Sequence, residues 1–251
     1  MKIISPDNYF ARLFFHYFEK ETRDNIQFTP SSLIMTELLK SENAVALIPT
    51  IDLIKNKDLY ISKSFGLSFE GGVSNSYIYY GSESKDITEI NLTGDVSSCE
   101  AVLSKILFKE LYNAELKVSL STGPVLEPGK NFILTGDKNF DEDIFVQGFS
   151  FAEEMVELIN LPYVNYVFAS KNPDLIKEFN SLAGIPVDKF LENPEKAIIE
   201  VIPENKQEYF AANISTLIFN YDEQDIQGIE QLLQLPYFHG VINDIIVLNL
   251  V

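Results

Sequence analysis

The sequence predicts an α/β fold that contains a parallel β-sheet. Strand-like and helix-like segments alternate along residues 1–51 in the order β-α-β-α-β, which favours parallel strands joined by helices. Residues 44–51, AVALIPTI, form an almost continuous apolar run, as a strand buried on both faces does. The 251 residues also suffice for two lobes of about 100–150 residues each. The chain is therefore compatible with a ligand cleft between two lobes.

The opening segments differ in pattern and can be assigned one by one. Short apolar stretches indicate strands, and longer apolar-rich stretches indicate helices. Pro30 fits the first turn of a helix, where its missing N–H costs nothing. We therefore expect strand 1–4, helix 8–20, strand 26–29, helix 30–41 and strand 44–51.

The rest of the chain continues with a strand-rich part and then a helical part. Gly71 and Gly72 interrupt the strand-rich stretch 64–82, where the backbone can bend. From Asn172 onward the chain is mostly helical, and residues 244–251 fit either a strand or a tail that faces a partner. Between them we expect strands at 87–92, 115–120, 131–137 and 163–170, and helices at 98–112 and 150–161.

Composition excludes several classes of function. The formal net charge is −18, and such a surface repels nucleic acid and anionic membranes. No apolar tract is long enough to span a membrane. The chain start lacks the pattern of an export signal, and the single cysteine fits a reducing compartment. We therefore expect a cytoplasmic protein. An anionic ligand would need a local group that attracts it, because the net charge of the protein repels it.

Common cofactor and metal motifs are absent from the sequence. It contains no GxGxxG, no P-loop and no GxSxG elbow. One cysteine and two distant histidines make zinc improbable. Residues 137–148 begin like a calcium loop but lack the required glycine and glutamate. We expect neither a cofactor nor a metal.

The stretch GDVSSCEAVLSKILF, residues 94–108, contains the only cysteine, Cys99, after two serines. Its apolar residues follow a helical spacing, and Ser97 with Glu100 has the pattern of a capping box. A helix start also offers free N–H groups to a carboxylate or phosphate. Two interpretations of Ser97 stay open: it caps the helix only, or it also binds an anion. A nucleophilic Cys99 is disfavoured because no histidine base is near.

Six segments, taken in order along the chain, form a recognisable set. They are FTPSSLIMTELLKSENAVALIPTIDLI, FGLSFEGGVSNSYIYY, LTGDVSSCEAVLSKILFKELY, ILTGDKNF, FAEEMVELINLPYVNYVFAS and YFAANISTLIFNYDEQDIQGIEQLLQL. Together they resemble the chorismate dehydratase family of the futalosine route to menaquinone. The resemblance covers about residues 1–235. It implies a two-lobed, type II periplasmic-binding-protein-like fold with a ligand cleft between the lobes. Residues 1–80 and 167–251 would form one lobe, and 81–166 the other.

The resemblance also implies an activity and a set of site residues. The family removes water from chorismate and gives 3-[(1-carboxyvinyl)oxy]benzoate, a reaction that needs positioning more than a strong base. Asn8 and Asn75 would be catalytic. The substrate, a small anionic carboxylate, would contact Pro49, Thr50, Ser76, Ser97, Ser98, Cys99 and Asp137.

Each of these residues also has a structural interpretation, and other functions stay open. Asn8 and Ser97 fit helix caps, and Asp137 fits a turn. Pro49 and Thr50 fit a strand end, and Asn75 and Ser76 fit polar positions at a strand edge. In place of the family's Thr-Ser this chain has Ser98 and Cys99. The alternatives are a non-catalytic intracellular binding protein for a small carboxylate, or an interaction module with a vestigial cleft and a contact-making tail at 236–251. A homodimer is a further expectation.

Overall fold

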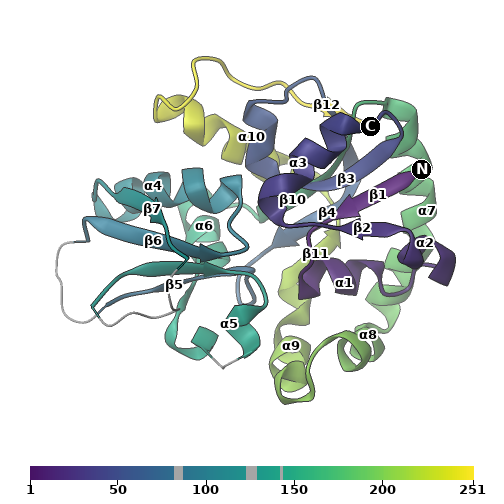
Figure 1. Ribbon diagram of the computed structural model, residues 1–251, viewed down its shortest axis with the longest axis horizontal. Coiled ribbons are helices and arrows are strands. Elements are labelled where there is room, and N and C mark those ends of the chain that lie inside the picture. Colours follow the sequence, from purple (N-terminus) through teal and green to yellow (C-terminus); the bar gives the residue numbers. More distant parts are fainter. Residues whose placement is uncertain (82–86, 123–128, 142–143) are drawn as a thin grey trace.

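The computed structural model describes residues 1–81, 87–122, 129–141 and 144–251. In this part of the chain the strands form two separate sheets, one of seven strands and one of five. Figure 1 shows each sheet with its own helices, and both chain ends lie beside the larger sheet. The α/β class predicted from the sequence is confirmed.

The first sheet has the order β11-β4-β10-β3-β1-β2, and β12 pairs with β4. As the sequence predicted, β1, β2 and β3 are parallel. The sheet as a whole is mixed, because β10 and β11 run antiparallel to their neighbours. Its strands are β1 (Lys2–Ser5), β2 (Ile26–Phe28), β3 (Ala44–Pro49), β4 (Tyr60–Phe69), β10 (Tyr163–Ser170), β11 (Leu217–Asn220) and β12 (Asn249–Leu250).

The second sheet has the order β7-β6-β8-β5-β9. Its strands β6, β7 and β8 are parallel, so their carboxyl ends meet at one edge. The strands are β5 (Ser76–Tyr79), β6 (Glu89–Gly94), β7 (Lys117–Leu120), β8 (Phe132–Thr135) and β9 (Phe149–Ser150).

The helices divide between the two sheets. In Figure 1, α4, α5 and α6 accompany the second sheet, and the others surround the first. The α-helices are α1 (Tyr9–Phe15), α2 (Lys20–Asp24), α3 (Ser31–Lys40), α4 (Ser98–Tyr112), α5 (Lys138–Asp141), α6 (Phe151–Ile159), α7 (Pro173–Glu192), α8 (Pro194–Val201), α9 (Gln207–Asn213) and α10 (Glu223–Phe238). Short 3-10 helices are η1 (Thr50–Ile54), η2 (Ile144–Gln147), η3 (Glu204–Lys206) and η4 (Ile214–Thr216). Among the described residues, no helix has the length and apolar composition needed to cross a membrane.

The chain crosses between the sheets twice. It leaves the first sheet after β4 and returns to it with β10. The strand β5 therefore belongs to the second sheet, although the sequence interpretation placed residues 1–80 in the first lobe. The return likewise begins at Tyr163 rather than at residue 167. We propose lobe boundaries within 70–75 and 160–162.

An aromatic cluster joins the two sheets beside these crossings. Phe140, from α5, is fully buried and lies 5.0 Å from the ring of Phe210 and 6.1 Å from that of Phe10. On the same side, the hydroxyl groups of Tyr77 and Tyr209 are 3.0 Å apart. These side chains come from elements that accompany both sheets, so their contacts connect the two halves of the molecule.

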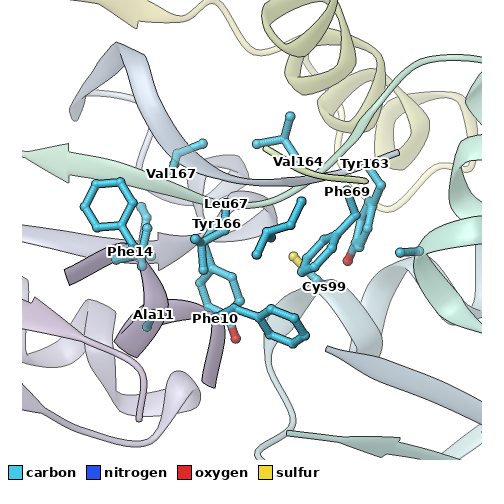
Figure 2. Close-up of a cluster of buried hydrophobic side chains, with 14 of the residues drawn as sticks. Phe10, Ala11, Phe14, Leu67, Phe69, Cys99, Tyr163, Val164, Tyr166 and Val167 are labelled. Atoms are coloured by element: carbon cyan, nitrogen blue, oxygen red, sulfur yellow. The ribbon is translucent and has the colours of Figure 1, made fainter. Parts of the chain in front are cut away.

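A second part of the core lies under β10. Figure 2 shows the Cys99 sulfur beside Phe69 and Tyr163, with Tyr166 pointing toward Phe10. Burial of these side chains supplies the main favourable term for folding at this position. The one cysteine of the chain is therefore part of the core.

Candidate functional site

A cleft of about 500 Å³ lies at the carboxyl ends of the parallel strands of the second sheet. Residues that follow β6, β7 and β8 form most of its wall. Residues that follow β1 and precede α3 come from the first sheet. The cleft is lined by Asp7, Pro30, Thr93, Gly94, Asp95, Ser121, Thr122, Thr135, Gly136, Asp137, Lys138 and Asp141.

Two turns of identical sequence lie in this wall. Leu-Thr-Gly-Asp occurs at residues 92–95, across the end of β6, and again at 134–137, across the end of β8. The two strands are parallel neighbours, and the N–H of Asp95 donates to the backbone oxygen of Thr135 at 3.0 Å. Gly94 and Gly136 have positive φ angles of 87° and 94°, a conformation that favours glycine. Each turn directs an aspartate toward the first sheet.

The carboxylate of Asp95 lies on the start of α3. The backbone N–H of Ser31 donates to it at 2.8 Å, and the hydroxyl of Ser31 donates at 2.6 Å. Pro30, the residue before α3, provides no side-chain cap. Asp95 therefore supplies from the second sheet the negative charge and the acceptors that a helix start favours.

Behind Asp95, buried polar groups continue the hydrogen-bond network. The hydroxyl of Ser31 is 2.8 Å from that of Tyr166 on β10. The side-chain amide of Asn75 in turn donates to the Tyr166 hydroxyl at 3.4 Å. All three side chains are almost completely buried. The network thus connects the cleft with Asn75, for which the family resemblance implies a catalytic role.

The carboxylate of Asp137 occupies the matching position at α1. It accepts a hydrogen bond of 2.9 Å from the N–H of Tyr9. Burial raises the pKa of Asp137 to about 7, with this N–H and the nearby Arg12 acting in the opposite direction. Burial also raises the pKa of the Tyr9 hydroxyl to about 12. A raised pKa of this kind suits a group that transfers protons near neutral pH.

The predicted serine cradle already contains a carboxylate of the chain itself. Glu100 accepts hydrogen bonds from the N–H and the hydroxyl of Ser97 at 2.9 Å and 2.7 Å, and from the hydroxyl of Ser76 at 2.7 Å. The capping box expected from the sequence is present. Glu100 is fully buried, so these donors do not face the cleft described above. This arrangement supports the capping interpretation of Ser97 and leaves the substrate contact a prediction.

The two residues that follow Ser97 also have their side chains directed at other parts of the protein. Ser98 begins α4, and its hydroxyl lowers the pKa of Asp52 against the larger, opposite effect of burial. The Cys99 side chain is fully buried, and burial raises its pKa to about 12. A thiol so protonated and enclosed is a poor nucleophile.

The other expected site residues lie near strand ends, as predicted, with structural partners. Asn8 caps α1, where its side-chain oxygen accepts from the N–H of Ala11 at 2.9 Å. Pro49 ends β3, and the hydroxyl of Thr50 donates to the backbone oxygen of Val164 at 2.6 Å. These three residues are buried, and their roles toward a ligand stay predictions.

The structure brings together only some of the predicted residues. The N–H of Gly136 donates to the backbone oxygen of Asn75 at 2.8 Å, which places Asn75 next to the Asp137 turn. Of the predicted set, Asp137 is the member that lines this cleft. The sequence interpretation missed Asp95, although the repeated Leu-Thr-Gly-Asp was a visible signal. Within the described ranges, no group of histidine, cysteine or acidic residues has the geometry of a metal site.

No protein-family model matches the chain, and no curated protein shows a significant match to its sequence. Solved structures do resemble it. Protein AF1704 from Archaeoglobus fulgidus has a TM-score of 0.69 and 13% identity, over 96% of this chain and 98% of that one. The Candida albicans CA3427 gene product, described as having the generic periplasmic binding protein fold, has a TM-score of 0.66 and 12% identity, over 97% and 91%.

A third similar structure is a binding protein named for its ligand. The periplasmic aliphatic sulphonate binding protein SsuA from Escherichia coli has a TM-score of 0.57 and 11% identity, over 98% of this chain and 94% of that one. Identities this low show a common fold and nothing finer. The chain has the two-lobed, periplasmic-binding-protein-like fold that its sequence predicted.

Proposed function

We propose that the protein binds a small molecule bearing hydroxyl or amino groups in the cleft between its two sheets. The observation that carries this proposal is the position of the cleft. It lies at the carboxyl ends of parallel strands, where α/β folds bind their ligands. The fold shared with SsuA supports binding as the basic activity.

The charges around the cleft favour a ligand that donates hydrogen bonds. The lining includes four aspartates, at positions 7, 95, 137 and 141, and one lysine, Lys138. Ionised carboxylates only accept hydrogen bonds. The net charge of −18 adds a general repulsion of anions. Amino or hydroxyl groups therefore fit this wall better than two carboxylates do.

Thermal unfolding with candidate ligands tests this proposal. Spermidine and glucose, as an amine and a polyol, should raise the melting temperature, because a ligand that binds only the folded state stabilises it. Asp141→Asn should weaken the effect, since Asp141 is exposed in the cleft and its loss leaves the core intact. A shift with chorismate and none with amines or polyols would contradict the proposal and support the second candidate.

The second candidate is a chorismate dehydratase-like lyase, as the sequence resemblance implies. One specific observation favours it, namely the raised pKa of Asp137 in the cleft. In the elimination the hydroxyl leaves as water and a ring carbon loses a proton. Asp137 would accept the ring proton as a carboxylate, or give its own proton to the departing hydroxyl as a carboxylic acid. Asn8 precedes Tyr9, whose N–H donates to Asp137, and would orient the leaving group.

Incubation with chorismate, followed by chromatography with mass detection, tests the lyase. Loss of one water from chorismate above the protein-free control is the expected result. Asp137→Asn should abolish it, whereas Asp174→Asn, which removes an exposed charge on α7, should not. Unchanged chorismate at high protein concentration would eliminate this candidate.

Three further expectations keep the status of proposals. They are a cytoplasmic location, assembly as a homodimer, and contacts of the tail at 236–251 with a partner. Sedimentation velocity at several protein concentrations would decide between monomer and dimer.

A further inference from the structure

The start of α3 is an anion position that is already filled. Two donors meet there, the N–H of Ser31 and its hydroxyl. The Tyr166 hydroxyl lies behind them and donates to the Ser31 hydroxyl oxygen at 2.8 Å, since the Ser31 proton is already given to Asp95. Both Ser31 and Tyr166 are completely buried, so their geometry is fixed by packing. The group that accepts both hydrogen bonds from Ser31 is the carboxylate of Asp95.

Asp95 reaches this position from the opposite side of the cleft. It follows β6 in the second sheet, while Ser31 begins α3, beside the first sheet, and lies 64 residues away in sequence. The carboxylate uses both oxygens, with bonds of 2.8 Å to the N–H and 2.6 Å to the hydroxyl of Ser31. Hydrogen bonds of this kind to an ionised group are the strong ones. A ligand's carboxylate in the same place would meet the same donors.

The backbone around Asp95 holds it there. Gly94 has a φ of 87°, and a Cβ at this position would lie 2.1 Å from the backbone oxygen of Thr135. The N–H of Asp95 donates to that same oxygen at 3.0 Å. The turn is thus fixed to the neighbouring strand, and the side chain enters the cleft from a rigid base.

We propose that Asp95 is an internal ligand, whose carboxylate fills the anion position at the start of α3 and bars anionic groups of a ligand from it. Asp95 is then a specificity-determining residue of the cleft. This role rests on the proposed binding function in one respect, since it explains why the cleft would prefer amines or polyols to carboxylates. The occupation of the α3 start does not depend on which ligand binds.

Chemical rescue tests the proposal on the unliganded protein. Asp95→Ala should lower the melting temperature by about 5–10 °C, because two hydrogen bonds to a charged group are lost. Sodium formate, a free carboxylate, should restore part of this loss, whereas sodium chloride at the same ionic strength should not. The wild-type protein should respond equally to both salts.

Two variants serve as controls. Asp95→Asn keeps an acceptor for the Ser31 N–H and should show no formate effect, because its side chain still fills the position. Asp7→Ala removes an exposed aspartate of the same cleft, one that pairs with Arg12, and should also show none. If Asp95→Ala does not fold, Asp95→Ser provides the same cavity with a smaller loss of polarity.

The outcomes separate this inference from the binding proposal. Equal effects of formate and chloride on a folded Asp95→Ala or Asp95→Ser protein would overturn the internal-ligand role. Formate rescue without any response of the wild-type protein to spermidine or glucose would support the internal ligand and reject the proposed binding function.

Discussion

Replacing Asp137 with asparagine should change how the stability of the protein depends on pH. The Asp137 side chain accepts from the N–H of Tyr9, and an asparagine oxygen can accept the same bond. The substitution therefore removes the charge and keeps the hydrogen bond. What it eliminates is the cost of burying an ionised carboxylate.

The magnitude follows from the two pKa values. Burial raises the pKa from 3.8 to about 7 in the folded state, so the folded protein binds the proton more tightly than the unfolded chain does. The stability from this group is complete below the unfolded value and is lost as the pH rises through the folded one. Between pH 5 and pH 8 the wild type should lose about 2.5 kcal/mol relative to Asp137→Asn.

Urea unfolding at pH 5 and pH 8 measures this difference directly. Other ionisable groups are common to both proteins and cancel in the comparison. Asp7→Asn, which removes an exposed charge in the same cleft, should show a much smaller change. A free-energy difference between wild type and Asp137→Asn that is the same at both pH values would refute the reasoning.

Further predictions concern the turns and the start of α4. Gly94→Ala should destabilise the fold more than Gly136→Ala, because its Cβ would lie 2.1 Å from a backbone oxygen, whereas that of Gly136 would be 3.5 Å from its nearest neighbour. Gly136→Ala should lower the free energy of unfolding by about 1–3 kcal/mol through its positive φ alone. Gly184→Ala, where a Cβ inside α7 meets open space, should raise the free energy of unfolding by up to about 1 kcal/mol. Denaturant titration of the three variants measures this order. Ser97→Ala should cost about 2–3 kcal/mol in the same assay, because buried Glu100 loses a hydrogen bond and α4 its cap. Cys99 should react with a thiol reagent at pH 8 only in denaturant, because it is buried and its pKa is raised to about 12; labelling of the native protein would contradict its place in the core.

Elements with a strong local pattern could be predicted from the sequence. Helix α4 covers the expected residues 98–112, where a capping box and helical spacing coincide, and β10 covers the expected strand 163–170. The strand β11 was missed, because its four residues lie between helical segments and are defined by pairing with β4. Local patterns carry little information about such pairings.

The candidate site was harder to predict because its contacts are distant in sequence. The pattern of a helix start correctly predicted Ser97 as a cap. The sequence could not show that Glu100 would also accept a hydrogen bond from the Ser76 hydroxyl. Asp95 meets Ser31 across 64 residues, and Asp137 meets Tyr9 across 128. The short repeat in the sequence contains both aspartates. Only the parallel pairing of β6 and β8 shows that the two repeats lie side by side in the structure.

The short strand β12 has a consequence for self-association. Along β4, β11 pairs with the end near Phe69, while β12 pairs with Tyr60 and Ile61 at the other end. The N–H of Lys63 also donates to the backbone oxygen of Val251 at 3.1 Å. Without the tail, these backbone groups would form an open sheet edge, which is a template for aggregation. We therefore expect the last residues of the chain to protect this part of β4 from pairing with another molecule.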